Sequence, residues 1–123
     1  MFKRILVGTD GSPTAALAVQ RAVELASSCG AQLTILSAGH PDRAAPIVAA
    51  EKARYEGQGV DIATDVVDGD PVTALLDRMH GGDFDLLVVG NKGMTGPSRF
   101  LPGSVPNKVS HKVPRALLIV RTT

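Results

Sequence analysis

The sequence predicts an α/β fold in which helices cover both faces of one mainly parallel sheet. Two observations lead to this prediction. Five short apolar runs recur along the chain, and the segments between them carry helical spacing or helix-capping residues. Apolar runs without polar alternation suit strands that are buried on both faces. Strict alternation of strands and helices implies right-handed crossovers, so we expect one doubly wound, five-stranded sheet with four helices.

The predicted strands are built from aliphatic residues. Aromatic residues make up only 3% of the chain, so Val, Leu, Ile and Ala must form the core. The expected strands span residues 5–8, 33–38, 62–67, 85–90 and 116–121.

Two of the predicted helices share one start signal. Ser12 and Asp70 are favourable N-caps, and each is followed by a proline at the first helical position, where the missing N–H costs nothing. We expect the first helix to end at Gly30 and the other at Gly81 and Gly82, because glycine commonly ends helices.

The other two helices have weaker patterns. Residues 44–57 predict a helix, provided that Pro46 lies in its first turn. The last helix is expected from about Ser104 to Lys112, because Pro114 prevents its continuation.

One strand-to-helix junction occurs twice in the sequence. The segment "DGSPTAAL" from Asp10 returns as "DGDPVTAL" from Asp68, and both fit the pattern D-G-x-P-x-x-A-L. The repeat indicates that one favourable turn is used at two places.

Length and charge exclude several classes of protein. The 123 residues suit one compact domain, residues 1–123. The net charge is +1 with scattered Lys and Arg, so the basic stripe of a nucleic-acid-binding protein is missing. Cys29 is the only cysteine, and the amino terminus resembles neither a signal peptide nor a membrane span. We therefore expect a cytoplasmic protein without nucleic-acid or membrane partners.

A glycine-rich stretch, "GNKGMTGPSRFLPGS", follows the fourth predicted strand. Its spacing is Gly90-x2-Gly93-x9-Gly103-Ser104. Glycine lets a ligand approach the backbone closely, and successive free N–H groups bind anions. A helix that begins at Ser104 would direct its own N–H groups to the same place. Since ligands of open α/β sheets bind beyond the carboxyl ends of the strands, the stretch predicts a phosphate-binding loop. A loop that needs glycines only to turn is the alternative.

The spacing G-x2-G-x9-G-S, the start "ILVGTDGSP" and the end "VSHKVPRALLIVR" together resemble the ATP-binding branch of the universal stress protein family. The likeness covers nearly the whole chain and is weakest over residues 40–58, where this chain is shorter than many relatives. It implies a Rossmann-like fold, also called adenine nucleotide alpha hydrolase-like, with strand order 3-2-1-4-5. It also implies bound ATP, with Mg²⁺ on a triphosphate. AMP, ADP and a cyclic nucleotide stay open as alternatives.

The resemblance assigns the adenine and ribose end of the ligand to the first two strands. Asp10 would hydrogen-bond the ribose or the adenine side, with Gly8 and Thr9 as the adjoining wall. Ala38 would offer backbone groups to the adenine edge. The alternative for Asp10 is a turn that merely starts the helix, and both roles can coexist.

The resemblance assigns the ribose and phosphates to the glycine-rich loop. The residues expected there are Val89, Gly90, Lys92, Gly93, Gly103, Ser104 and Val105. Backbone N–H groups of the last three would bind the phosphate tail, together with the Ser104 hydroxyl, whereas Lys92 either reaches a phosphate or is a solvated loop lysine. Pro106 departs from the family pattern because it has no N–H and removes one possible phosphate donor, although a first helical turn accepts proline.

The sequence lacks the groups of a dedicated enzyme. Asp10 has no neighbouring acid, and His40, His80 and His111 share no metal-ligand spacing. The G-x4-G-K-[ST] pattern of P-loop ATPases is absent. We expect no dedicated catalysis, and slow ATP hydrolysis stays open.

Two functional hypotheses follow. In the first, ATP orders residues 91–102 of a stress-response regulator and alters a surface seen by an unknown protein partner. In the second, the protein is a dimeric interaction module with an empty or vestigial pocket. Pro106 and the last strand, "ALLIVR", favour the second hypothesis, because that strand resembles the edge that the family uses for two-fold pairing. A homodimer through this strand is expected.

Overall fold

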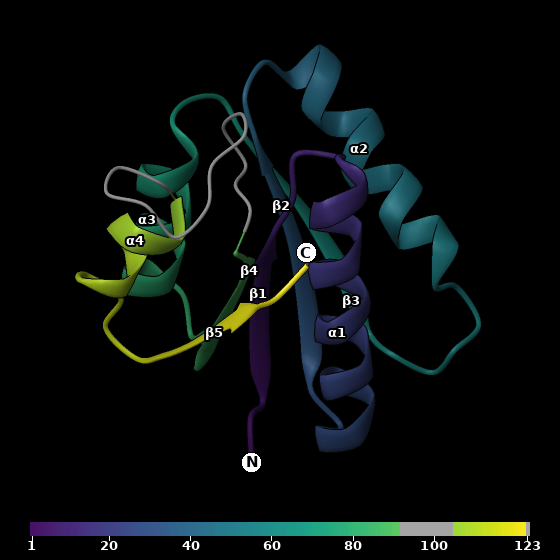
Figure 1. The fold of residues 1–123 in the computed structure, drawn as a ribbon. Helices are drawn as coiled ribbons and strands as arrows, with labels where there is room; N and C mark the ends of the chain where they lie inside the picture. Colours follow the sequence, from purple (N-terminus) through teal and green to yellow (C-terminus); the bar gives the residue numbers. More distant parts are fainter. Residues whose placement is uncertain (92–104, 123) are drawn as a thin grey trace.

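The computed structural model describes residues 1–91 and 105–122, in which strands and helices alternate as predicted (Figure 1). The elements in chain order are β1 (Arg4–Gly8), α1 (Pro13–Cys29), β2 (Gln32–Ala38), α2 (Pro41–Arg54), β3 (Ile62–Val67), α3 (Pro71–Gly81), β4 (Leu86–Gly90), α4 (Val105–Ser110) and β5 (Ala116–Val120).

The strands form one sheet in the order β3-β2-β1-β4-β5, which confirms the expected order. Every neighbouring pair is parallel, so the sheet is wholly rather than mainly parallel. The chain first builds outward from β1 to β3 and then returns to the other side of β1 with β4. The strand order therefore reverses between β1 and β4, which is where open α/β sheets bind ligands.

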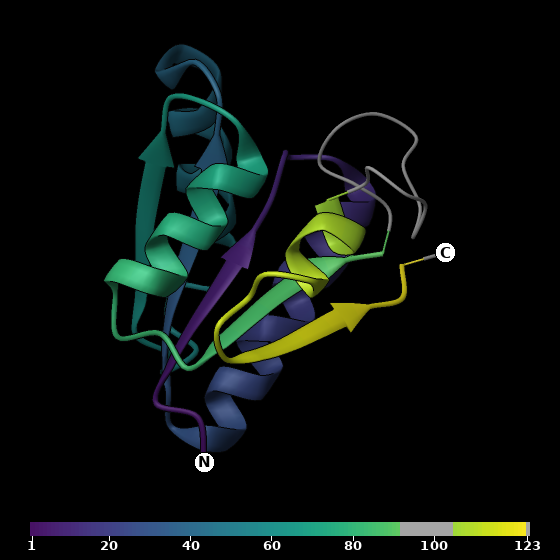
Figure 2. The same cartoon turned by 90° about the vertical axis from the view of Figure 1, so that its left-hand side faces the viewer.

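Helices cover both faces of the sheet, as predicted. α1 and α2 pack on one face, and α3 and α4 on the other. Figure 2 shows the green α3 and the lime α4 in front of the sheet, with the dark blue α1 behind it. Side chains alternate along each strand, so Ile5 and Val7 enter the core under α1, whereas Leu6 enters the core under α3.

Burial on both faces is restricted to the three central strands. All core positions of β1, β2 and β4 are buried, but β3 and β5 are largely exposed or half-buried. The prediction that all five strands are buried is therefore wrong for the two edge strands. Each edge strand has a neighbour on one side only, and α2 packs against β3 on one face of the sheet.

The two predicted helix starts are confirmed. The Ser12 hydroxyl accepts a hydrogen bond from the Ala15 N–H at 3.1 Å, and the Asp70 carboxylate accepts one from the Thr73 N–H at 2.9 Å. Each cap stabilises its helix by about 1 kcal/mol. Gly30 ends α1 in the left-handed conformation with φ 65°, which only glycine adopts without strain.

The prediction for α2 is wrong at its start. The helix begins at Pro41 and Pro46 lies inside it, beyond the first turn. His40 is the N-cap, and its Nδ1 accepts a hydrogen bond from the Asp42 N–H at 3.1 Å. Pro46 leaves the Asp42 carbonyl without its usual helical partner, and this loss is tolerated in an exposed part of the helix.

The short α4 ends two residues before the predicted end at Lys112. The N–H groups of Lys112 and Val113 both reach the Val109 carbonyl, at 3.1 and 2.9 Å, and close a turn there. The predicted start, Ser104, lies outside the described residues. Within the described part of the chain, no helix has the length and apolar character needed to cross a membrane.

Candidate functional site

The carboxyl ends of β1, β2 and β4 lie at the same edge of the sheet, because these neighbouring strands are parallel. Gly8, Ala38 and Gly90 are the last residues of these strands. The structure therefore brings three residues of the sequence-predicted site to the edge where the strand order reverses.

A cavity of about 140 Å³ lies beyond the ends of β1 and β2. Two residues of the predicted site, Asp10 and Ala38, contribute to its lining. The full lining consists of Asp10, Ser37, Ala38, Gly39, His40, Arg43, Ala44 and Ile47. The turn after β1, the end of β2 and the first turns of α2 therefore enclose one space.

Backbone hydrogen bonds fix the carboxylate of Asp10 beside this cavity. Its Oδ1 accepts a hydrogen bond from the Ser12 N–H at 2.9 Å, which is the predicted turn at the start of α1. Among the described residues, no hydrogen bond to its Oδ2 is found. Oδ1 therefore stabilises the turn, whereas Oδ2 accepts no hydrogen bond from the described residues.

Thr9 supports this turn from inside the protein. Its side chain is fully buried, and Oγ1 accepts a hydrogen bond from the Gly11 N–H at 3.1 Å. Its own N–H donates to the Leu36 carbonyl at 3.0 Å and so extends the pairing of β1 with β2. Thr9 and Gly8 are therefore a rigid wall behind Asp10.

Sequence reasoning missed the wall that α2 contributes. His40, Arg43 and Ile47 line the cavity because α2 begins earlier than predicted. Pro41 followed by Asp42 was the available signal, since proline at the first helical position and an acid in the first turn both mark a helix start. Histidine is an uncommon N-cap, which hid that signal.

Val89 and Gly90 at the end of β4 differ in what they can offer a ligand. The Val89 side chain is buried in the core under α3 and α4, so only its backbone can contact a ligand. Gly90 is half-buried and has no side chain. Of the remaining predicted residues, Val105 begins α4, whereas Lys92, Gly93, Gly103 and Ser104 lie outside the described residues.

The residue after Gly90 is tied to the end of β5. The Asn91 N–H donates to the Val120 carbonyl at 2.8 Å. Its side-chain Oδ1 accepts hydrogen bonds from both the N–H and the hydroxyl of Thr122, at 2.8 and 2.9 Å. The second residue of the glycine-rich stretch is thus held against the end of β5 and the residue Thr122 beyond it by three hydrogen bonds.

The metal-binding capacity of the described residues is small. In residues 1–91 and 105–122, no group of three or more His, Cys, Asp or Glu side chains could hold a metal ion. Asp10 is the one carboxylate that lines the cavity. Mg²⁺ commonly takes one or two carboxylates together with phosphates and water, so these residues fit a Mg²⁺ ion held mainly by a bound nucleotide.

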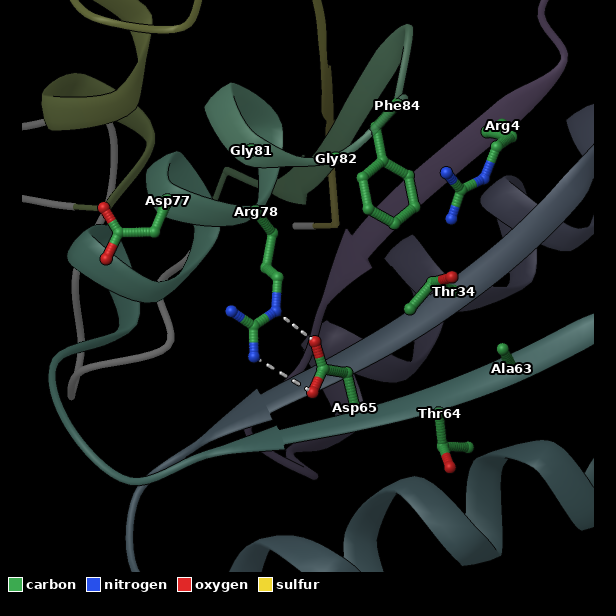
Figure 3. Close-up of a pocket in the computed structure, with 10 residues that line it drawn as sticks. All are labelled: Arg4, Thr34, Ala63, Thr64, Asp65, Asp77, Arg78, Gly81, Gly82 and Phe84. Atoms are coloured by element: carbon green, nitrogen blue, oxygen red, sulfur yellow. Dashed lines mark hydrogen bonds and ion pairs between the residues drawn. The ribbon is translucent and has the colours of Figure 1, made fainter.

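A larger hollow of about 470 Å³ lies at the opposite end of the strands, against α3 (Figure 3). Three of its charged groups, Arg4, Asp65 and Arg78, already have partners. Arg78 forms an ion pair with Asp65, and this hydrogen bond raises the pKa of the Arg78 guanidinium. The Arg4 guanidinium lies 4.5 Å from the centre of the Phe84 ring. Paired charges far from the reversal of strand order make this hollow a weaker candidate than the Asp10 cavity.

The universal stress protein family model matches residues 1–56 and 42–121. The two matched stretches overlap over residues 42–56, which lie mostly in α2. A break in the match at α2 agrees with the expectation that this chain is shorter there than its relatives.

Individual relatives are similar over their full length. The universal stress protein MT1672 of Mycobacterium tuberculosis is 35% identical, with 99% of this chain and 98% of the relative covered. YxiE of Bacillus subtilis is 29% identical, with 98% and 100% covered. A solved universal stress protein in complex with cAMP is 37% identical, with 99% and 98% covered and a TM-score of 0.85. The resemblance noted in the sequence is confirmed, and the chain belongs to the universal stress protein family.

Proposed function

We propose that this protein binds an adenine nucleotide at the carboxyl ends of β1, β2 and β4. The observation that carries the proposal is the Asp10 carboxylate, fixed through one oxygen beside a cavity that Ala38 also lines. The cavity adjoins the reversal of strand order, where this class of sheet binds ligands. The cAMP complex of a relative 37% identical to this chain supports the choice of an adenine nucleotide.

The nucleoside end is proposed to lie against the first two strands. The Oδ2 atom of Asp10 would accept a hydrogen bond from a ribose hydroxyl or from the adenine amino group. Ala38 would present backbone groups to the adenine edge, with Gly8 and Thr9 behind the ring. Charged hydrogen bonds of this kind contribute about 1.5–3 kcal/mol.

The phosphate end is proposed to lie against the glycine-rich stretch. Gly90 would let the ribose approach the backbone, Val89 would contribute only backbone groups, and the loop spacing supports phosphate contacts. The residues proposed for those contacts are Lys92, Gly93, Gly103, Ser104 and Val105. Pro106 is buried in the first turn of α4 and offers no N–H, so the terminal phosphate of ATP would lose one donor. ATP with Mg²⁺ is the first ligand to test, followed by ADP, AMP and cAMP.

Nucleotide binding is proposed to regulate a protein partner in the cytoplasm during stress. The ligand would order the loop and so change the adjoining surface. Self-association through β5 is part of the proposal, because β5 is an edge strand with Leu118 exposed. Exposed strand edges are ready sites for pairing with another chain.

Calorimetry on nucleotide-stripped protein tests the binding proposal. ATP, ADP, AMP and cAMP are titrated separately, with GTP as the control for base specificity. A saturable heat and a rise in melting temperature with an adenine nucleotide are expected, because a ligand of the folded state stabilises it. Absence of both with every adenine nucleotide would refute the proposal.

The second candidate function is a dimeric interaction module with an empty pocket. The exposed β5 edge and Pro106 favour it. Replacing Gly103 with valine separates the two candidates, since the bulk would block the phosphate loop and leave β5 unchanged. If partner binding survives while nucleotide binding is lost, the interaction module is the correct function. Light scattering at micromolar protein tests the dimer, and Leu118→Lys is expected to give a monomeric mass.

A further inference from the structure

A groove of about 440 Å³ separates α1 from α2 on the outside of the molecule. Its α1 wall is formed by residues at helical spacing, and its α2 wall by one turn near the end of that helix. The lining consists of Gly11, Ser12, Pro13, Ala16, Leu17, Gln20, Glu51, Arg54 and Tyr55. A second hollow of about 270 Å³ shares Gly11, Glu51 and Arg54 with it, so the groove continues on both sides of Glu51.

Glu51 is a buried acid whose hydrogen bonding is incomplete. Its side chain is 5% exposed, and Oε1 is buried without a hydrogen-bond partner among the described residues. Arg54 forms an ion pair with this oxygen, with Nε at 3.2 Å, but the contact is not a hydrogen bond. Buried polar atoms are nearly always hydrogen-bonded, and a buried charge without such bonds is costly. A better donor would therefore gain free energy here.

Arg54 covers this carboxylate without being fixed in place. Its side chain is 59% exposed, so the guanidinium can move into solvent once another cation pairs with Glu51. Such an exchange leaves the buried carboxylate paired and avoids the cost of an uncompensated buried charge.

Apolar surface leads to the carboxylate from the α1 side. Pro13, Ala16 and Leu17 line the groove there, and the Leu17 side chain is 43% exposed. Tyr55 stands on the α2 side. Burial, and then the negative charge of Glu51, raise the pKa of the Tyr55 phenol, so the ring lies within the field of the carboxylate. The groove thus combines apolar side chains, an aromatic ring and a buried carboxylate whose ion-pair partner is Arg54.

We propose that this groove binds a primary alkylammonium group, which replaces Arg54 on Glu51. The ammonium would donate hydrogen bonds to the Glu51 carboxylate, and the alkyl stem would lie along Pro13, Ala16 and Leu17. An ammonium is compact and has three donors on a freely rotating head. The planar guanidinium of Arg54 already lies at the carboxylate and makes no hydrogen bond to Oε1, so an ammonium suits the site better than a second guanidinium.

This proposal does not depend on nucleotide binding. The groove lies between α1 and α2, whereas the Asp10 cavity lies between the strand ends and α2. The lining of the groove shares no residue with that cavity, and the second hollow shares only Ile47 with it. Failure of one proposal therefore leaves the other intact.

Tyrosine fluorescence of the nucleotide-free protein tests the proposal. Tyr55 is the only tyrosine and the chain has no tryptophan, so intrinsic fluorescence reports on this groove alone. Titration with n-butylammonium is expected to give a saturable change. n-Butanol is expected to give none, and n-butylguanidinium is expected to bind more weakly. No saturable change with n-butylammonium would overturn the proposal, and so would equal binding of the alcohol or the guanidinium.

Two substitutions and one control assign the binding to Glu51. Glu51→Gln is expected to weaken binding of n-butylammonium about tenfold or more, since it removes a charged hydrogen-bond acceptor. Glu24→Gln removes an exposed acid that also acts on Tyr55, and binding is expected to stay unchanged. Equal affinity of Glu51→Gln and the unchanged protein, or an equal loss with Glu24→Gln, would contradict the proposal.

Arg54→Ala is the decisive variant if Glu51→Gln does not fold. Arg54 is exposed, so its removal should leave the fold intact, and circular dichroism checks this. Because Arg54 competes for the carboxylate, Arg54→Ala is expected to tighten n-butylammonium binding several-fold. Unchanged or weaker binding would overturn the proposal.

A free polyamine and a lysine side chain of another protein both carry the proposed group. Spermidine and a lysine-containing pentapeptide with blocked ends are therefore titrated separately, with the norleucine pentapeptide as control. The amine that binds more tightly identifies the source. If neither binds, or if norleucine binds as well as lysine, the proposal is wrong.

Discussion

The two D-G-x-P turns have the same local sequence and lie in different parts of the sheet. The turn at Asp10 follows β1, which has a neighbour on each side, whereas the turn at Asp68 follows the edge strand β3. Asp10 is half-buried and lines a cavity. Asp68 is exposed, and its carboxylate makes no hydrogen bond within the described residues. The sequence of a turn thus determines how the helix starts, and its position in the strand order determines whether a ligand can reach it.

The two turns also distribute their acids differently. In the first, the Asp10 carboxylate accepts a hydrogen bond from the Ser12 N–H, and the Ser12 hydroxyl caps the helix. In the second, Asp70 alone caps the helix, through the N–H and the hydroxyl of Thr73. The first acid of the second turn is therefore unnecessary for the turn, which makes Asp68 a natural control for Asp10.

The largest expected difference between the turns is in nucleotide affinity. Asp10→Ala is expected to weaken binding of an adenine nucleotide about 10- to 100-fold, because a charged hydrogen bond to the ligand is lost. Asp68→Ala is expected to leave the affinity unchanged. Calorimetry measures both, and thermal unfolding shows whether Asp10→Ala still folds. Equal losses for the two variants would show that the turns do not differ in this way.

Alanine at either turn glycine is expected to destabilise the fold by about 1–3 kcal/mol through backbone strain, since φ is 82° at Gly11 and 147° at Gly69. Only at Gly11 would the new methyl group also meet a neighbour, because its Cβ would lie 3.1 Å from Ile47. Adding Ile47→Ala should therefore offset part of the loss from Gly11→Ala and none of the loss from Gly69→Ala.

Urea denaturation of the single and double variants measures this coupling. An interaction energy of about 0.5 kcal/mol or more between positions 11 and 47 is expected. If Ile47→Ala offsets the destabilisation of Gly69→Ala to the same extent, the two turns do not differ in this contact.

The two N-caps should contribute similarly despite their different chemistry. Ser12→Ala and Asp70→Ala are each expected to lower the free energy of unfolding by about 1 kcal/mol, and glycine at either position only by a few tenths. Urea denaturation is the measurement. A loss confined to one turn would show that the surrounding packing, rather than the cap, holds the other helix.

The smallest expected effect concerns the groove beside the first turn, which contains the only tyrosine. The pKa of Tyr55 is raised above 10.0, first by burial and then by Glu51. The folded state therefore holds the phenolic proton more tightly than the unfolded state does. The contribution of Tyr55 to the free energy of unfolding should thus be constant below about pH 10. Above about pH 10 this contribution should fall as the pH rises.

Tyr55→Phe tests this effect. Other groups also titrate in alkali, so the comparison is between the two proteins at each pH. The variant is expected to lose less stability between about pH 9 and pH 11 than the unchanged protein. If the free energies of unfolding of the two proteins fall equally over this pH range, Tyr55 makes no contribution.

The order of the elements could be predicted because its signals are local. Ser12 with Pro13 and Asp70 with Pro71 mark helix starts through capping and through the fixed φ of proline, whatever surrounds them. The start of α2 could not be predicted in the same way, because its cap is His40. The exposure of the edge strands also escaped prediction, since it depends on which strands lie beside each other.

The candidate site could be predicted only where it depends on strand ends. Asp10 and Ala38 line the cavity because they end or follow neighbouring parallel strands. Arg43 and Ile47 line it because α2 packs across the strand ends, and such packing is long-range information. Val89 was also expected at the site, but its side chain is buried in the core under α3 and α4. Whether a strand side chain points to the core or to a ligand depends on the helices that pack on the sheet.

The three hydrogen bonds that join Asn91 to Val120 and Thr122 have a thermodynamic consequence. A second copy that displaced β5 on pairing would also displace the residue that enters the glycine-rich stretch. Self-association and ligand occupancy would then be linked equilibria. By thermodynamic reciprocity, a nucleotide that changes the dimer dissociation constant must itself bind the dimer and the monomer with different affinities. With one site in each subunit, saturation changes the dimer dissociation constant by the square of the affinity factor per site.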